Sequence, residues 1–170
     1  IMVQDAPLSG VELSVDLLVR LTQEAPGVCY FEIETPQTAD KLRALIDAGG
    51  DAILGPFDGE ESITLIADLN AGASGTMPSA LLPDLIKPIL SNHKEGNLKR
   101  ASELYAEILP LINFENRQCG LRACKTVMKE GGVIASDYVR HPLPAMPQET
   151  RTQLMELTRR LNPLTLTWGR

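Results

Sequence analysis

The stretch Val28-Cys29-Tyr30-Phe31-Glu32-Ile33-Glu34-Thr35 reads as a β-strand that carries two carboxylates on one face. Because successive side chains of a strand point to opposite faces, the alternation defines two sets: Tyr30, Glu32 and Glu34 on one face, and Cys29, Phe31 and Ile33 on the other. Two carboxylates that share a buried space are costly unless that space is a wet, functional pocket. The pattern fits either such a pocket or an edge strand with a solvated acidic face.

The bulk composition is that of an ordinary globular domain. The chain has 170 residues, of which 44% are hydrophobic and 22% are charged, so it is long enough to bury a sizeable core. Its net charge of -6 and the absence of a strongly basic stretch argue against nucleic acid or an anionic membrane as a partner. The basic residues between Arg117 and Lys129 are typical of a solvated helix face. The sequence has no apolar run of the roughly 18 residues that a membrane-spanning helix needs.

The cysteines and histidines predict neither a metal site nor a cofactor. The chain has three cysteines and two histidines, and Cys119-x4-Cys124 matches neither a zinc motif nor a redox Cys-x-x-Cys motif. Reduced thiols in the cytoplasm are the expected state. The chain opens on Ile1-Met2-Val3, which reads as a strand already in progress and suggests a fragment.

Strand and helix patterns alternate through the first 80 residues. We predict strands at 1–4, 28–34, 52–54 and 73–77, with Gly55-Pro56-Phe57-Asp58-Gly59 as a loop. Helices are expected from Ser14, a good N-cap, to about 25, from 38 to 48, and from 60 to 70. Strand starts near 1, 28, 51 and 73 have the spacing of β/α repeats with parallel strands.

After residue 80 the pattern becomes helical, with helices predicted at 82–94, 98–114, 115–130 and 148–161. Four parallel units cannot close a barrel, and an open sheet would leave its outer strands unpaired. We therefore predict an α/β fold, the second half of a TIM (β/α)8 barrel (strands 5–8) with a C-terminal helical extension. Residues 1–80 would form the half-barrel of four β/α units, and residues 81–170 the last barrel helix plus the C-terminal helical region. A small doubly wound sheet is the alternative.

Four motifs come in a telling order: Ile1-Met2-Val3-Gln4-Asp5-Ala6-Pro7, Tyr30-Phe31-Glu32-Ile33-Glu34, Gly55-Pro56-Phe57-Asp58-Gly59 and Gly72-Ala73-Ser74-Gly75-Thr76-Met77. Their order and spacing resemble strands five to eight of the dihydrodipicolinate synthase and N-acetylneuraminate lyase family. Leu109-Pro110-Leu111-Ile112-Asn113-Phe114-Glu115 and Cys119-Gly120-Leu121-Arg122-Ala123-Cys124-Lys125 extend the resemblance along the chain. Within the family the chain looks closest to L-2-keto-3-deoxyarabonate dehydratases, whose sixth strand reads Tyr-Phe-Lys-Ile-Glu.

The resemblance implies a class I lyase mechanism. A lysine on strand six condenses with the 2-keto group of a substrate, and the iminium then acts as an electron sink for C–C cleavage, condensation or loss of water. Active sites of such barrels lie at the carboxyl ends of the strands. Glu34 would then be an acid/base candidate, and Gln4, Gly59 and Met77 would line the substrate pocket. The implied partners are a pyruvate-like or 2-keto-3-deoxypentonate substrate and further copies of the chain.

The chain departs from the family at the lysine position, which is Glu32. A glutamate cannot form an imine, and its charge would oppose both a keto acid and Glu34. We therefore predict a fragment of a keto-acid lyase or dehydratase that is inactive as written, so that whether the chain is an enzyme stays open. The alternative is a lysine-less pseudoenzyme that binds a ligand or serves as an assembly subunit.

Other roles for these residues stay open from the sequence. Glu34 could instead be a structural carboxylate paired with an arginine of the helical part, such as Arg117 or Arg122. Glu32 and Glu34 could hold a divalent cation together with Asp58, since oxygen ligands suit Mg²⁺ or Ca²⁺. The remaining lysines considered as substitutes for the missing nucleophile, Lys41, Lys87 and Lys125, all fall on predicted helices rather than at strand ends.

Overall fold

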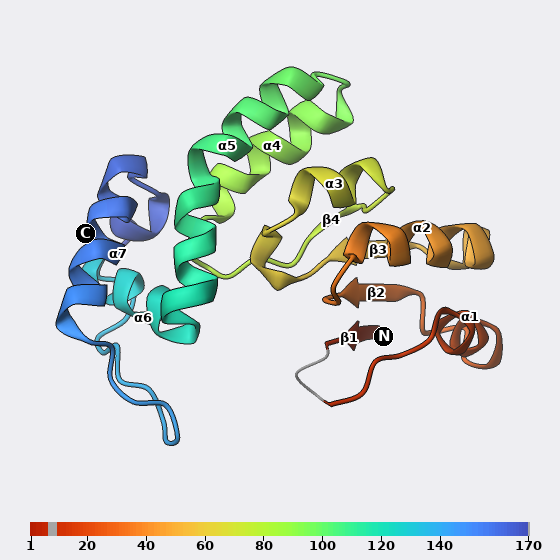
Figure 1. Ribbon diagram of the computed structural model, residues 1–170, viewed down its shortest axis with the longest axis horizontal. Coiled ribbons are helices and arrows are strands. Elements are labelled where there is room, and N and C mark those ends of the chain that lie inside the picture. Colours follow the sequence, from red (N-terminus) through yellow and green to blue (C-terminus); the bar gives the residue numbers. More distant parts are fainter. Residues whose placement is uncertain (7–9, 170) are drawn as a thin grey trace. The chain divides into compact units, whose positions relative to one another are not determined.

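The computed structural model describes residues 1–6 and 10–169 and divides into two compact units, Ile1–Met77 and Pro78–Arg170. The first unit holds a parallel sheet in the order β1-β2-β3-β4. Its strands are β1 (Met2–Asp5), β2 (Tyr30–Ile33), β3 (Gly55–Asp58) and β4 (Gly75–Thr76). The parallel α/β architecture is confirmed (Figure 1). The assignment of the two units to a half-barrel and its helical extension stays a prediction.

Helices α1 (Val15–Glu24), α2 (Thr38–Gly49) and α3 (Leu65–Asn70) connect the strands. The predicted N-cap is confirmed, because the Ser14 hydroxyl accepts a hydrogen bond from the Leu17 amide. The apolar core of this unit joins β2 to α1 and α2, and Phe31 and Ile33 are fully buried in it. Its buried members are Leu18, Val28, Phe31, Ile33, Leu42, Leu45 and Ala71.

The third strand was predicted in the wrong place. Residues 50–52 form a 3₁₀ turn, η2 (Gly50–Ala52), and the strand is the stretch Gly55–Asp58 that we expected as a loop. Glycine and proline normally indicate a turn, yet here Gly55 is needed because a Cβ atom would lie 2.3 Å from the Tyr30 ring. The close approach of that ring, which only a glycine allows, explains the error.

The helix expected at 60–70 begins only at Leu65. Glu60, Glu61 and Ser62 have φ angles of 48°, 51° and 72°, which are left-handed values that a right-handed helix excludes. They form a short 3₁₀ turn, η3 (Glu60–Ser62), directly after Gly59. Three such residues in a row are strained, and strain of this kind concentrates at functional sites.

The second unit is helical, as predicted. It contains α4 (Pro83–Lys94), α5 (Leu98–Phe114), α6 (Leu121–Glu130) and α7 (Gln148–Leu161), and α5 and α7 have the predicted bounds. The helix expected at 115–130 is instead interrupted: η4 (Glu115–Cys119) is a π-helical turn, and Gly120 follows with a φ of 59°. A 3₁₀ turn, η5 (Leu164–Leu166), follows α7.

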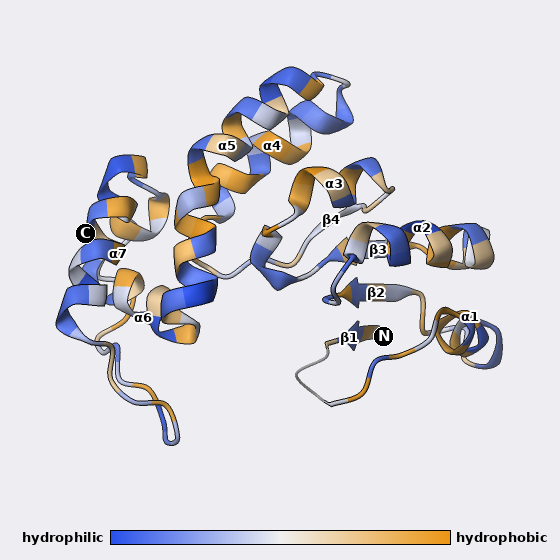
Figure 2. Ribbon diagram, viewed as in Figure 1, coloured by the Kyte–Doolittle hydropathy of each residue, from blue (hydrophilic) through white to orange (hydrophobic). Residues whose placement is uncertain are grey.

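Apolar residues run along both α4 and α5 (Figure 2), and the buried side chains of this unit include Ile89, Leu111, Ile112 and Leu154. Between α6 and α7 the chain follows an extended connector at residues 133–147. In the part of the chain that the structure describes, no helix combines the length and the apolar character needed to cross a membrane.

Candidate functional site

The candidate site is the face of the sheet opposite the core. Strand register places Glu32 between Gln4 on β1 and Phe57 on β3. Phe31 and Ile33, its neighbours along β2, are fully buried, whereas the Glu32 side chain is only half-buried. The predicted alternation of β2 is therefore confirmed, and the glutamates lie on the face away from α1 and α2.

The Gln4 side-chain amide joins the two predicted catalytic positions. Its Nε2 donates to Glu32 Oε1 at 3.2 Å and to Glu34 Oε2 at 2.9 Å. Three of the predicted site residues thus form one hydrogen-bonded group at the carboxyl end of β1 and β2. An amide that donates to both carboxylates partly offsets their repulsion.

Further glutamates surround this group. Burial, the charge of Glu34 and the charge of Glu61 all raise the pKa of Glu32. Burial also raises the pKa of Glu61, again with the charges of Glu34 and Glu60. The strained turn η3 therefore brings its carboxylates toward β2. The site therefore concentrates carboxyl groups, and the pKa values of Glu32 and Glu61 are raised, which suits proton transfer better than binding an anion.

The two other predicted residues occupy different places. The Gly59 amide donates to the Ile33 carbonyl at 3.0 Å, and a Cβ atom at Gly59 would lie 2.8 Å from the Glu34 Cβ. Gly59 thus lets the loop after β3 pack directly against Glu34. Met77 follows β4, and its amide donates to the Asp58 carbonyl at 2.8 Å. The structure brings Gly59 to the glutamates, while Met77 stands on the far side of β3 from β2.

The cation hypothesis for Asp58 is wrong. Asp58 lies opposite Ile33 in the sheet register, so its side chain points to the face away from Glu32. It accepts a hydrogen bond from the Thr76 hydroxyl at 2.6 Å instead. Within the described ranges, no group of three or more His, Cys, Asp or Glu side chains is placed to hold a metal ion.

A second polar cluster on the core side of the sheet was missed from the sequence. Asp58 and Asp68 are 1% and 0% exposed, and the Thr76 hydroxyl lies 2.7 Å from the Ser62 hydroxyl, while Thr64 donates to Asp68 at 2.5 Å. Burial raises the pKa of Asp58 to about 8; the Thr76 hydrogen bond lowers it, and Asp68 raises it further. The cluster ties η3 to β3, β4 and α3. A correct placement of β3 would have shown Asp58 facing inward.

Lys41 also lies on the core side of the sheet, where it forms ion pairs. Its Nζ lies 2.6 Å from Asp5 Oδ2 and 3.0 Å from Glu12 Oε1, and its side chain is 10% exposed. Burial lowers its pKa, but the hydrogen bonds and charges of Asp5 and Glu12 raise it more, so the net shift is upward. A lysine held protonated in this way is a poor nucleophile. Lys125, another of the three lysines considered as substitutes, donates to the Tyr138 carbonyl.

The model of the dihydrodipicolinate synthetase family matches residues 1–161 of the chain. The chain belongs to this family. A curated relative, the L-2-keto-3-deoxyarabonate dehydratase of Azospirillum brasilense, is 55% identical over 169 residues, which are 99% of this chain and 55% of the relative. The 4-hydroxy-tetrahydrodipicolinate synthase of Methanothrix thermoacetophila is 25% identical over 159 residues, covering 92% and 52% of the two chains.

Solved structures support the fold of this family member. Dihydrodipicolinate synthase from Aquifex aeolicus superimposes with a TM-score of 0.86 at 24% identity, covering 95% of this chain and 55% of that chain. A catalytic lysine mutant of Ruminococcus gnavus sialic acid aldolase gives 0.79 at 20% identity, covering 93% and 52%. The chain spans about half the length of the relatives it matches.

Proposed function

We propose that this chain is the strand 5–8 half of a keto-acid lyase or dehydratase of the Schiff-base class, acting on a 2-keto-3-deoxy sugar acid. In this proposal Glu32 occupies the position of the Schiff-base lysine, so the chain as written forms no imine. The observation that carries it is the hydrogen-bonded group of Gln4, Glu32 and Glu34 at the carboxyl end of parallel strands. Barrel enzymes place their chemistry at that end of the strands.

The geometry at residue 32 fits a position at which glutamate has replaced a nucleophilic lysine. Glu32 lies on a central strand, with β1 on one side and β3 on the other, and its side chain leaves the sheet on the face opposite the buried Phe31 and Ile33. A lysine there would reach the same space with Glu34 two residues beyond. Glu34 would serve as the proton donor or acceptor for loss of water from the iminium, because it is held by Gln4 and flanked by Gly59.

The identity of the substrate rests on one relative. The Azospirillum protein is named an L-2-keto-3-deoxyarabonate dehydratase, and its 55% identity extends over nearly the whole chain. We therefore take a 2-keto-3-deoxypentonate as the substrate class, with pyruvate as the smaller analogue, and the cytoplasm as the place of action. With a lysine at residue 32, the proposed reaction would need neither a metal nor an organic cofactor, since the iminium itself would be the electron sink.

A second function is favoured by the same carboxylates. As a lysine-less ligand-binding or assembly subunit, the chain would retain an ordered acidic site without covalent chemistry. The raised pKa values of Glu32 and Glu61 fit a pocket whose carboxyl groups, when protonated, donate hydrogen bonds to acceptors of a ligand. The two functions differ in what a lysine at residue 32 would do.

Borohydride trapping tests the proposal. The chain is incubated with pyruvate or with a 2-keto-3-deoxypentonate, reduced, digested and mapped by peptide mass spectrometry. We expect no reduced adduct on any lysine of the chain as written. The Glu32→Lys variant should gain an adduct confined to the peptide that carries residue 32, because the surrounding groups are already in place.

Glu32→Gln is the matched control, since it removes the same charge without adding an amine. A reduced adduct in the unsubstituted chain would contradict the loss of the nucleophile. If Glu32→Lys folds, as judged by circular dichroism against Glu32→Gln, yet forms no adduct, the enzyme proposal fails. The binding or assembly role would then be the better account.

A further inference from the structure

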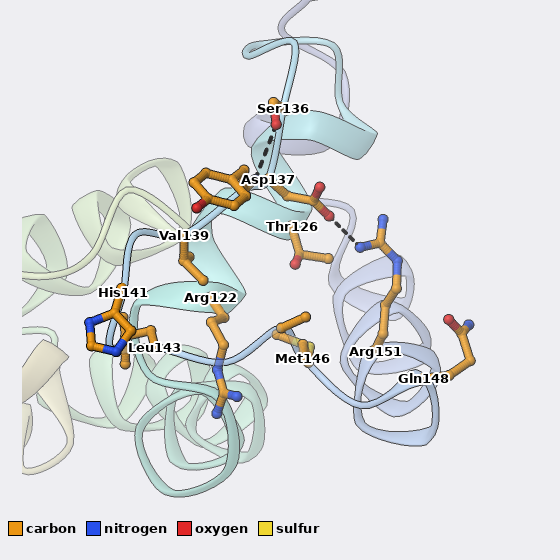
Figure 3. Close-up of a pocket in the computed structure, with 12 residues that line it drawn as sticks. Arg122, Thr126, Ser136, Asp137, Val139, His141, Leu143, Met146, Gln148 and Arg151 are labelled. Atoms are coloured by element: carbon orange, nitrogen blue, oxygen red, sulfur yellow. Dashed lines mark hydrogen bonds and ion pairs between the residues drawn. The ribbon is translucent and has the colours of Figure 1, made fainter.

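The second unit contains a pocket of about 590 Å³ that belongs to none of the groups described above. It lies between α6, the connector and the start of α7 (Figure 3). Its volume is within the range of pockets that take small molecules. Since every lining residue comes from the second unit, the pocket is complete within that unit.

Ion pairs fix the walls of this pocket. Asp137 on the connector accepts from Lys129 at 2.9 Å and from Arg151 at 2.5 Å. These two hydrogen bonds lower the pKa of Asp137 to about 2. Lys125 also holds the connector by donating to the Tyr138 carbonyl. The pocket is therefore preorganised, and its one aspartate has its charge compensated by two cations.

Arg122 supplies a cation without a carboxylate partner. Its Nε donates to the Cys119 carbonyl at 2.9 Å, and its Nη1 reaches the Pro144 carbonyl at 3.4 Å. These neutral contacts hold the guanidinium in place, and across residues 1–6 and 10–169 no Asp or Glu forms an ion pair with it. A guanidinium with open donors is suited to a planar anion such as a carboxylate.

Thr126 lies one turn along α6 from Arg122, so both side chains share a helix face. The residue is 2% exposed and lines the pocket, and Figure 3 shows its hydroxyl directed into the space between Arg122 and Arg151. Its hydroxyl has no hydrogen-bond partner among the residues that the structure describes. The hydroxyl is therefore free to donate a hydrogen bond to an acceptor bound in the pocket, such as a carboxylate oxygen.

Apolar side chains of the connector form one part of the lining, which also includes Ser136, His141 and Gln148. Val139, Leu143 and Met146 of the connector face the space beside Arg122 and Thr126. We propose that this pocket binds a small organic carboxylate with a branched apolar body, its carboxylate on Arg122 and Thr126 and its body against the connector. Such a site is separate from the strand-end carboxylates of the first unit.

The test is isothermal titration calorimetry of the whole chain with 4-methylpentanoate. We expect saturable binding, with 4-methylpentanamide, its uncharged match, and acetate, which lacks the apolar body, each binding about tenfold more weakly or worse. Arg122→Met should weaken binding by about tenfold or more, and Thr126→Val, which keeps the side-chain shape, by a smaller factor. Arg140→Met removes an arginine charge from the connector outside the pocket lining and should leave binding unchanged.

Three results would overturn the proposal. They are a dissociation constant weaker than about 10 mM for 4-methylpentanoate, equal binding of the acid and its amide, and binding that Thr126→Val leaves intact. If Arg122→Met does not fold, the comparison of acid with amide in the unsubstituted chain still decides the outcome.

Discussion

At the residue scale, Asp58 makes the stability of the first unit depend on pH. Its folded pKa of about 8 lies above the value near 3.9 of a free aspartate, so the folded chain binds a proton that the unfolded chain releases. Stability linked to this group is fully present below about pH 4 and is lost as pH rises through about 8. Chemical denaturation at a series of pH values should show the free energy of unfolding falling across this window.

Asp58→Asn tests the assignment, because an asparagine keeps the shape and cannot lose a proton. The variant should show a flatter profile between about pH 4 and pH 8. The charges of Asp68 and Glu60 contribute to the raised pKa of Asp58. Asp137 offers a contrast: its pKa is lowered to about 2 by Lys129 and Arg151, so its contribution is lost only as pH falls below about 4. An unchanged profile in Asp58→Asn would rule out this group.

Single residues also show where sequence reasoning succeeds. The grouping of Glu32 with Glu34 follows from the period of two within one strand, and Gln4 joins them through a parallel register that the repeat of β/α units predicts. The contacts of Asp58 with Thr76 and Asp68 link a strand, its neighbour and a helix. Such contacts depend on which face Asp58 takes, and the sequence pattern had placed it in a loop.

At the element scale, the start of α1 depends on one side chain. The Ser14 hydroxyl accepts from the Leu17 amide at 3.2 Å, and Asp16 adds a favourable charge in the first turn. Ser14→Ala should lower the free energy of unfolding by about 1 kcal/mol. Ser14→Asp restores an acceptor and should recover most of that loss, and thermal or urea unfolding measures both. A loss equal in the two variants would show that the hydroxyl does not act as a cap.

The elements predicted correctly are those with local start and stop signals. Ser14 begins α1, and the glycine at 96 separates α4 from α5 with a φ of 81°. The errors fall where tertiary packing overrides local preference. Gly55 and Pro56 lie in a strand because the Tyr30 ring needs the space, and η3 takes left-handed angles while Ser62 is tied to Thr76. Neither neighbour is close in sequence, so no local pattern could indicate them.

At the scale of the whole molecule, the open sheet predicts self-association. β1 and β4 are the edges of the sheet, each with a neighbour on one side only in the described sheet. Met2 on β1 and Tyr30 on β2 lie side by side in the register and are 40% and 39% exposed. Unpaired edges next to exposed apolar side chains favour pairing with another chain. We therefore expect homo-oligomers, in keeping with the partner that the family resemblance implies.

Sedimentation velocity over a range of micromolar concentrations measures this association. The chain should sediment as a dimer or larger species and shift toward the monomer on dilution. Met2→Lys places a charge on the edge strand, which is how natural edges resist pairing, and should raise the dissociation constant. Leu121→Lys is the matched control, because Leu121 is 72% exposed but belongs to α6 and not to a strand. A monomer at every concentration would contradict the predicted self-association. Equal effects of the two substitutions would exclude the sheet edge as its cause, because Met2 lies on that edge and Leu121 does not.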